Sequence, residues 1–189
     1  MITGHFGLAV GVKKYAPHLP LWSLLISTFW LDILFMVLSS LGVESFTTVN
    51  PDKPVYGEVV IHAFYTHSLV GAIAISAITG WLASLRWKRE AGIAIGVVIF
   101  SHWLLDLLVH RPDLPILPGN LGGLPLLGLG LWDRPLWSAG IELVLALGGS
   151  YLYYRSTTTL KGDLQRARKA AILTSVLLLL LFITSIMGL

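Results

Sequence analysis

Two histidines and an aspartate recur at every fourth position of one apolar segment, as His102, Asp106 and His110. In a helix this spacing places all three side chains on one face. Imidazole and carboxylate groups bind zinc, manganese or iron, and the chain has no cysteine that could add a thiolate ligand. The spacing therefore predicts a metal site. The alternative is a neutral hydrogen-bonded network that packs helices together.

The segment that carries these residues is apolar enough to lie in a lipid bilayer. An ionisable side chain at that depth costs about 3 kcal/mol or more. Such groups therefore need a partner, a cation or trapped water.

The composition is that of an integral membrane protein. Of the 189 residues, 55% are hydrophobic and only 12% are charged, whereas soluble domains have roughly 25% charged residues. The mean hydropathy is +0.78. The net charge of +3 comes from basic residues scattered between apolar segments, so we expect a lipid bilayer as partner and no nucleic acid.

Hydropathy predicts an all-α, polytopic helical bundle that forms a single domain, 1–189. A spanning helix needs about 20 apolar residues. The predicted elements are an N-terminal half-helix, 1–15, and five spans, 20–42, 67–85, 91–109, 135–154 and 170–187.

Basic residues set the expected orientation of these spans. Lys13 and Lys14 precede the first span, Arg86 and its neighbours separate the second from the third, and a further basic group separates the fourth from the fifth. The positive-inside rule puts all of these on the cytoplasmic side. The segments 43–66 and 110–134 then form outer loops, and the C-terminus lies outside.

Further candidate ligands come from other segments. Counting about 1.5 Å per residue along each span puts Asp32 level with His102, and His67 near the outer end of the third span. The half-helix lifts His5 towards the same depth. The predicted metal ligands are therefore His5, Asp32, His67, His102, Asp106 and His110.

Six donors exceed the four that one zinc ion takes, so we expect one or two ions, most readily zinc, with manganese or iron as options. Alternatives stay open for single residues. Asp32 could relay protons, His67 could belong to a helix start capped by Ser68 or Thr66, and His5 could lie in the membrane interface.

Three more residues are candidates for catalysis and substrate binding. Glu142 in the fourth span could act as a general base with Asp106, or could be a packing residue held by a hydrogen bond. Arg111 and Arg134 in the second outer loop could bind a phosphate, because the guanidinium fork matches two oxygens. Pairing of these arginines with loop aspartates is the alternative.

Several motifs resemble a known family. Gly4-His5, Asp32, Thr66-His67-Ser68-Leu69 and Ser101-His102-Trp103-Leu104-Leu105-Asp106 look like the bacterial membrane-bound metal-dependent hydrolases, over most of residues 1–155. The resemblance implies a hydrolase in a bacterial or archaeal cytoplasmic (inner) membrane.

The order of these residues is also distantly similar to the ligand order of zinc-dependent phospholipase C. Carried over, that similarity implies that Asp32, His67, His102 and Asp106 are core ligands, and that His5 and His110 serve flanking metals. The phospholipase pattern continues with His-x3-Glu on a later helix. This chain departs from it, because it has no histidine after His110 and only Glu142 in that region.

We therefore expect a membrane-embedded, metal-dependent hydrolase that cleaves a phosphoester of a lipid or lipid-linked substrate with metal-activated water. The alternative is a proton- or metal-ion-coupled transporter that uses the same histidines and aspartates. A third possibility is a scaffold whose histidines only join helices.

Overall fold

The computed structural model describes residues 1–48, 59–157 and 163–187, and it is almost entirely helical. The helices are α1 (Ile2–Val12), α2 (Leu21–Thr28), α3 (Trp30–Ser40), α4 (Leu69–Trp87), α5 (Arg89–Val109), α6 (Pro135–Ser156) and α7 (Leu164–Met187), with two short 3-10 helices, η1 (Pro118–Gly123) and η2 (Leu131–Asp133). Strands β1 (Ser45–Thr48) and β2 (Val59–His62) form one small antiparallel hairpin. The predicted all-α class is confirmed apart from this hairpin.

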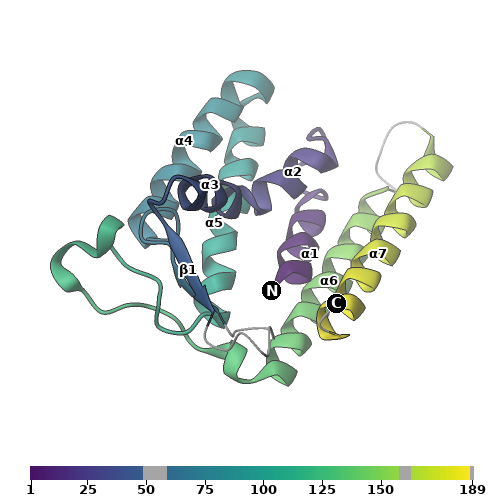
Figure 1. Cartoon of the computed structure of the whole chain (residues 1–189). Coiled ribbons are helices and arrows are strands. Elements are labelled where there is room, and N and C mark those ends of the chain that lie inside the picture. Colours follow the sequence, from purple (N-terminus) through teal and green to yellow (C-terminus); the bar gives the residue numbers. More distant parts are fainter. Residues whose placement is uncertain (49–58, 158–162, 188–189) are drawn as a thin grey trace.

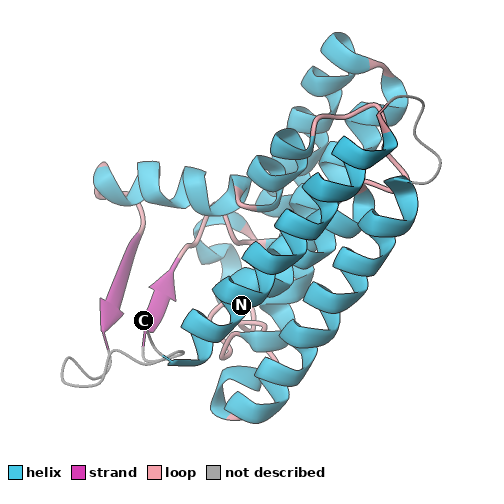
Figure 2. Cartoon of the chain, turned by 90° about the vertical axis from the view of Figure 1, so that its right-hand side faces the viewer, coloured by secondary structure: helices cyan, strands magenta, loops and turns pink. Residues whose placement is uncertain are grey.

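Two groups of helices make up the molecule (Figure 1). Helices α4 and α5 pack along each other on one side, α6 and α7 on the other, and α1 lies against α6. Figure 2 shows α3 running crosswise to the long helices and leading into β1. The main apolar core lies where α2 and α3 meet α5, around the fully buried Leu24, Leu31 and Ile99.

The prediction of five spans is corrected to three or four. Among the described residues, α4, α5 and α7 are long and apolar enough to cross a membrane, and a fourth span exists if α2 and α3 count as one. This fits a membrane protein. The positive-inside orientation stays a prediction.

The predicted span 20–42 is broken. Helices α2 and α3 are bent by 51° relative to each other at Phe29. Its backbone angles of φ −108° and ψ 11° lie outside the helical region. A break leaves backbone carbonyls outside the intrahelical ladder, where other groups can bind them.

The predicted span 135–154 does form a helix, α6, but not one apolar enough to count as a span. The reason is that α6 carries polar and small residues which it buries inside the protein, including Ser138, Glu142 and Gly149. These residues lower its mean hydropathy while serving the contact with α1.

That contact brings two backbones together at glycines. A Cβ added at Gly7 would lie 2.5 Å from the carbonyl oxygen of Leu145, and a Cβ at Gly149 would overlap the carbonyl group of Gly7. Small residues allow this close approach of membrane helices. Glu142 also joins the two helices, because its Oε1 accepts hydrogen bonds from the backbone N–H groups of Thr3 (2.8 Å) and Gly4 (3.3 Å).

The segment 110–134, which was predicted as the second outer loop, is mostly non-helical and is hydrogen-bonded to the helices. The carbonyl groups of Pro115 and Ile116 accept hydrogen bonds from the first backbone N–H groups of α4, Leu69 and Val70. Helix starts have such unsatisfied donors, so this loop caps α4. Of the first predicted outer loop, 43–66, residues 49–58 lie outside the described residues.

The glycine contact can be tested with a matched pair of neighbouring substitutions. Gly149→Ala should lower the free energy of unfolding by about 1–3 kcal/mol, because the new methyl group has no space. At Gly148, no described atom lies within 4 Å of an added Cβ, so Gly148→Ala should be neutral or stabilising, by up to about 1 kcal/mol from helix propensity. Thermal unfolding in detergent micelles measures both. Equal stability of the two variants would contradict the contact.

Candidate metal centre

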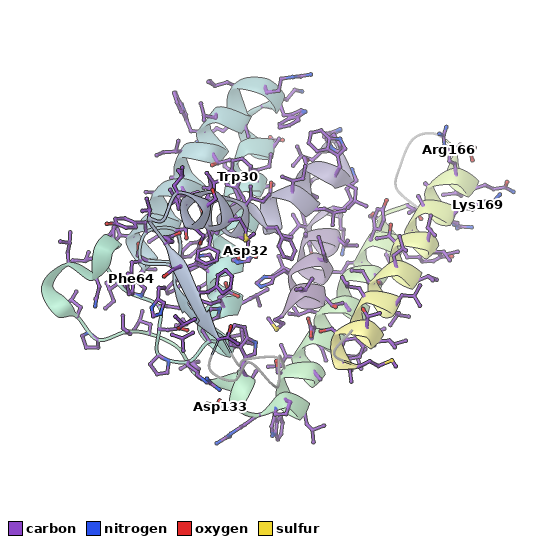
Figure 3. The ribbon with its side chains drawn as sticks, viewed as in Figure 1. Trp30, Asp32, Phe64, Asp133, Arg166 and Lys169 are labelled. Atoms are coloured by element: carbon purple, nitrogen blue, oxygen red, sulfur yellow. The ribbon has the colours of Figure 1, made fainter. Side chains whose placement is uncertain are left out.

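The predicted metal ligands come from four separate elements. His5 lies on α1, Asp32 on α3, His67 just before α4, His102 and Asp106 on α5, and His110 directly after α5 as its C-cap. The four histidines and Asp106 are all buried. Asp32 differs, because its side chain is 39% exposed. Asp32 lies where α3 crosses α5 (Figure 3). The cluster is accessible from the surface on the side of this residue.

Asp106 is the centre of the cluster. Its Oδ2 lies 2.9 Å from Nε2 of His102 and 3.6 Å from Nε2 of His67, and its Oδ1 lies 3.1 Å from Nε2 of His5. His110 Nε2 is further away, at 3.9 Å from Oδ2. The helical spacing therefore places His102 against Asp106 and leaves His110 at the edge.

Asp32 closes the cluster from the opposite helix. Its Oδ1 lies 3.4 Å from Nε2 of both His67 and His102. Two groups of three side chains thus have the geometry to hold a metal ion, each with donor atoms within 4.8 Å of one another: His5, His102 and Asp106, and Asp32, His67 and His102. One ring nitrogen binds one ion, so the two groups overlap at His102 and are not independent sites.

Two histidines, His102 on α5 and His110 at its end, each have the second ring nitrogen, Nδ1, bonded to an acceptor. His102 Nδ1 donates to the carbonyl oxygen of Thr28 at the end of α2, at 2.6 Å. His110 Nδ1 donates to Oδ1 of Asp113, at 2.9 Å. We assign these protons from the partners, since a carbonyl oxygen and a carboxylate only accept. In neutral rings Nε2 is then bare and is free to bind a cation.

This assignment creates an electrostatic conflict at His102. Its bare Nε2 faces Oδ2 of Asp106 at 2.9 Å, and both atoms are acceptors in a buried place. His102 Nε2 accordingly makes no hydrogen bond to any described residue. Two facing buried acceptors are unfavourable unless a positive charge lies between them.

A proton or a metal ion can supply that charge. Protons alone do not neutralise the whole cluster favourably. The rings of His5 and His102 stack with their centroids 4.1 Å apart. Protonating both rings would therefore place two positive charges against each other. Within the described part of the chain, the basic groups within 4.0 Å of Asp32 or Asp106 are all histidines. The donor set fits a divalent cation.

His5 differs from the other ligand candidates. Its Nε2 donates to Asp106 Oδ1, while its Nδ1 is buried without a hydrogen-bond partner among the described residues. The hydroxyl of Thr28 donates to the backbone carbonyl of His5 at 3.1 Å. The backbone of His5 is thus fixed against α2. Its ring has no acceptor at Nδ1 among the described residues, whereas His102 has one.

The other predicted residues lie elsewhere. Glu142 caps the start of α1 through its bonds to Thr3 and Gly4. Arg111 Nε donates to Asp133 Oδ1 at 3.2 Å in a partly exposed pair, and Figure 3 places Asp133 at the edge of the molecule, well away from Asp32. Arg134 is exposed just before α6.

Two partners of the predicted ligands, Thr28 and Asp113, were not predicted as site residues. Thr28 binds His102 through its backbone, and no side-chain pattern identifies a backbone acceptor. Asp113 follows His110 by three residues, a spacing that a search for carboxylates near each histidine would have found. Ser68, one of the two predicted caps, does cap α4, because its Oγ accepts a hydrogen bond from the backbone N–H of Gly71 at 3.0 Å.

No protein-family model, no curated protein and no solved structure matches this chain.

Proposed function

We propose that this chain is a membrane-embedded, metal-dependent hydrolase that cleaves a phosphoester of a lipid or lipid-linked substrate. The observation that carries the proposal is the meeting of bare imidazole nitrogens with two carboxylates in a buried, apolar place. Such a cluster is stabilised by a divalent cation. A cation of this kind lowers the pKa of a bound water and polarises a phosphoryl oxygen.

The ligands of a first ion would be Asp32, His67, His102 and Asp106. Four nitrogen and oxygen donors with a water as a fifth ligand would suit zinc, with manganese or iron as options. The two oxygens of Asp106 face different histidines, His5 from Oδ1 and His102 from Oδ2. A second ion could therefore share Asp106, with His5 or His110 as its histidine ligand.

Proton transfer falls to Asp32 in this proposal. Asp32 is the partly exposed carboxylate of the cluster, so water can reach it while the rest of the cluster stays buried. Its Oδ1, which faces His67 and His102, would bind the ion, and its Oδ2 would take a proton from the attacking water. Glu142 is less suited to the role of base, because its Oε1 already accepts two backbone hydrogen bonds.

The surroundings of Asp32 favour a lipid substrate. Its helix, α3, exposes Ile33, Met36 and Val37. An acyl chain can lie along these apolar side chains while a head group reaches the carboxylate. Arg111 and Arg134 remain candidates for contacts with a phosphate outside the buried cluster.

A transporter is the second candidate, and the broken helix pair α2 and α3 favours it. Discontinuous helices near a buried ion site are typical of secondary transporters. In that case Asp32 and His102 would bind a coupling ion, and no chemical turnover would occur.

Metal content is the first test. The purified chain should contain about one or two zinc, manganese or iron ions, measured by elemental analysis. His102→Gln and Asp106→Asn should bind the metal at least about tenfold more weakly, because each removes a direct ligand. His18→Gln is the matched control, since His18 is exposed and lies outside the cluster. A folded wild-type chain without metal, or equal metal content in all three variants, would refute the metal centre.

Turnover is the second test. The wild-type chain in lipid vesicles should release phosphate or a phosphorylated head group from a bacterial lipid extract, followed by phosphorus NMR. A chelator should abolish release and added zinc should restore it. Asp32→Asn should reduce the rate by about 10²–10⁴-fold if Asp32 transfers the proton, while His18→Gln should keep full activity. Ion flux into the vesicles without any release would support the transporter instead.

A further inference from the structure

Glu44 is a buried carboxylate that belongs neither to the predicted ligands nor to an ion pair within the described part of the chain. It lies between α3 and β1 and is 2% exposed. Its Oε1 accepts hydrogen bonds from the backbone N–H groups of Tyr65 (2.7 Å) and Thr66 (2.9 Å), and its Oε2 accepts one from the hydroxyl of Thr66 (2.8 Å). All three bonds thus lead to the two residues that precede His67.

The hydroxyl of Thr66 connects Glu44 with His67. Thr66 Oγ1 lies 2.8 Å from Glu44 Oε2 and 2.9 Å from His67 Nδ1. A hydroxyl has one proton to donate, and a carboxylate can only accept. Thr66 therefore donates to Glu44, and its oxygen accepts from His67. This requires the proton of His67 to be on Nδ1.

The consequence for His67 is a bare Nε2 on the side of the cluster. That nitrogen lies 3.4 Å from Asp32 Oδ1 and 3.6 Å from Asp106 Oδ2. Without Glu44, Thr66 could donate its proton to Nδ1 instead, and Nε2 would carry the hydrogen. A protonated Nε2 can bond to the aspartates but cannot bind a metal ion.

The backbone around His67 is held independently of this chain of bonds. Trp103 Nε1 donates to the carbonyl oxygen of His67 at 2.8 Å, and the His67 N–H donates to the carbonyl of Ala63 at 3.3 Å. The position of the residue therefore has several supports, whereas the position of its ring proton depends on Thr66 and Glu44.

We propose that Glu44, acting through the hydroxyl of Thr66, is a positioning residue that sets the tautomer of His67 and so makes its Nε2 available to the metal ion. The proposal rests on the metal centre proposed above. Partners that orient a ligating histidine commonly change metal affinity by about 10–100-fold when they are removed. Here a hydroxyl stands between the carboxylate and the ring.

Glu44→Gln tests the direction of the hydrogen bonds with almost no change in shape. The glutamine oxygen can still accept from the two backbone N–H groups, but its NH₂ group donates to Thr66, which turns the hydroxyl proton towards His67. The metal-free variant should then show His67 protonated on Nε2 in ¹⁵N NMR of labelled histidines, with His67→Gln used for assignment. Zinc affinity, measured against a competing chelator, should fall by about 10–100-fold. Glu90→Gln, on an exposed glutamate, should match the wild-type chain.

Two substitutions at Thr66 give a second measurement if Glu44→Gln does not fold. Thr66→Ser keeps the hydroxyl and should keep wild-type zinc affinity, whereas Thr66→Val removes it and should lose affinity. Equal zinc affinity of these two variants would overturn the proposal, as would a Glu44→Gln chain that binds zinc normally with His67 protonated on Nδ1. In those cases the metal centre itself stands. A wild-type chain that binds no zinc, manganese or iron would overturn both.

Discussion

The structure depends on one electrostatic constraint, which is that acceptor atoms face one another in a buried place. Two carboxylates, from Asp32 and Asp106, meet ring nitrogens whose protons are held on the far side of the ring. In water such groups would be hydrated separately. Inside an apolar bundle they repel each other unless a proton or a metal ion lies between them. Much of the fold around them can be understood as the means of bringing these atoms together.

Irregular helices bring the predicted ligands to one point. Helix α1 is too short to span a membrane, and its N-terminal turn carries His5 to the centre. The break at Phe29 turns α3 across the bundle, so that Asp32 faces α5, and it leaves the Thr28 carbonyl free to hold His102. A straight span would neither turn Asp32 towards α5 nor leave the Thr28 carbonyl free. Close glycine contacts between α1 and α6 then keep the short helix in place.

Three of the four histidines in the cluster are also held by a partner on their Nδ1 side. A backbone carbonyl holds His102, Asp113 holds His110, and the pair of Thr66 and Glu44 holds His67. These partners use three different kinds of acceptor, but they have the same effect, because each places the proton on Nδ1 and turns Nε2 to the centre. Such partners orient the ring and raise its basicity as a ligand. The cluster is thus prepared for a cation by bonds outside it.

The sequence by itself determined the class of the protein and most of the cluster. Composition identified a helical membrane protein, and the spacing of His102 and Asp106 put them on one helix face, because helical periodicity is a local property. It did not determine the number of spans. Hydropathy treats residues 20–42 as continuous, since no proline or glycine lies between its end residues, Pro20 and Gly42, to mark the break at Phe29.

Only the tertiary structure decided which atoms face one another. It placed Glu142 at the start of α1 as a cap, Arg111 in a surface pair with Asp133, and Glu44 behind His67 from more than twenty residues away. It also left Nε2 free on His67, His102 and His110. The reason is that a ring proton follows its hydrogen-bond partner, and these partners, including a backbone carbonyl, meet the rings only when the chain has folded.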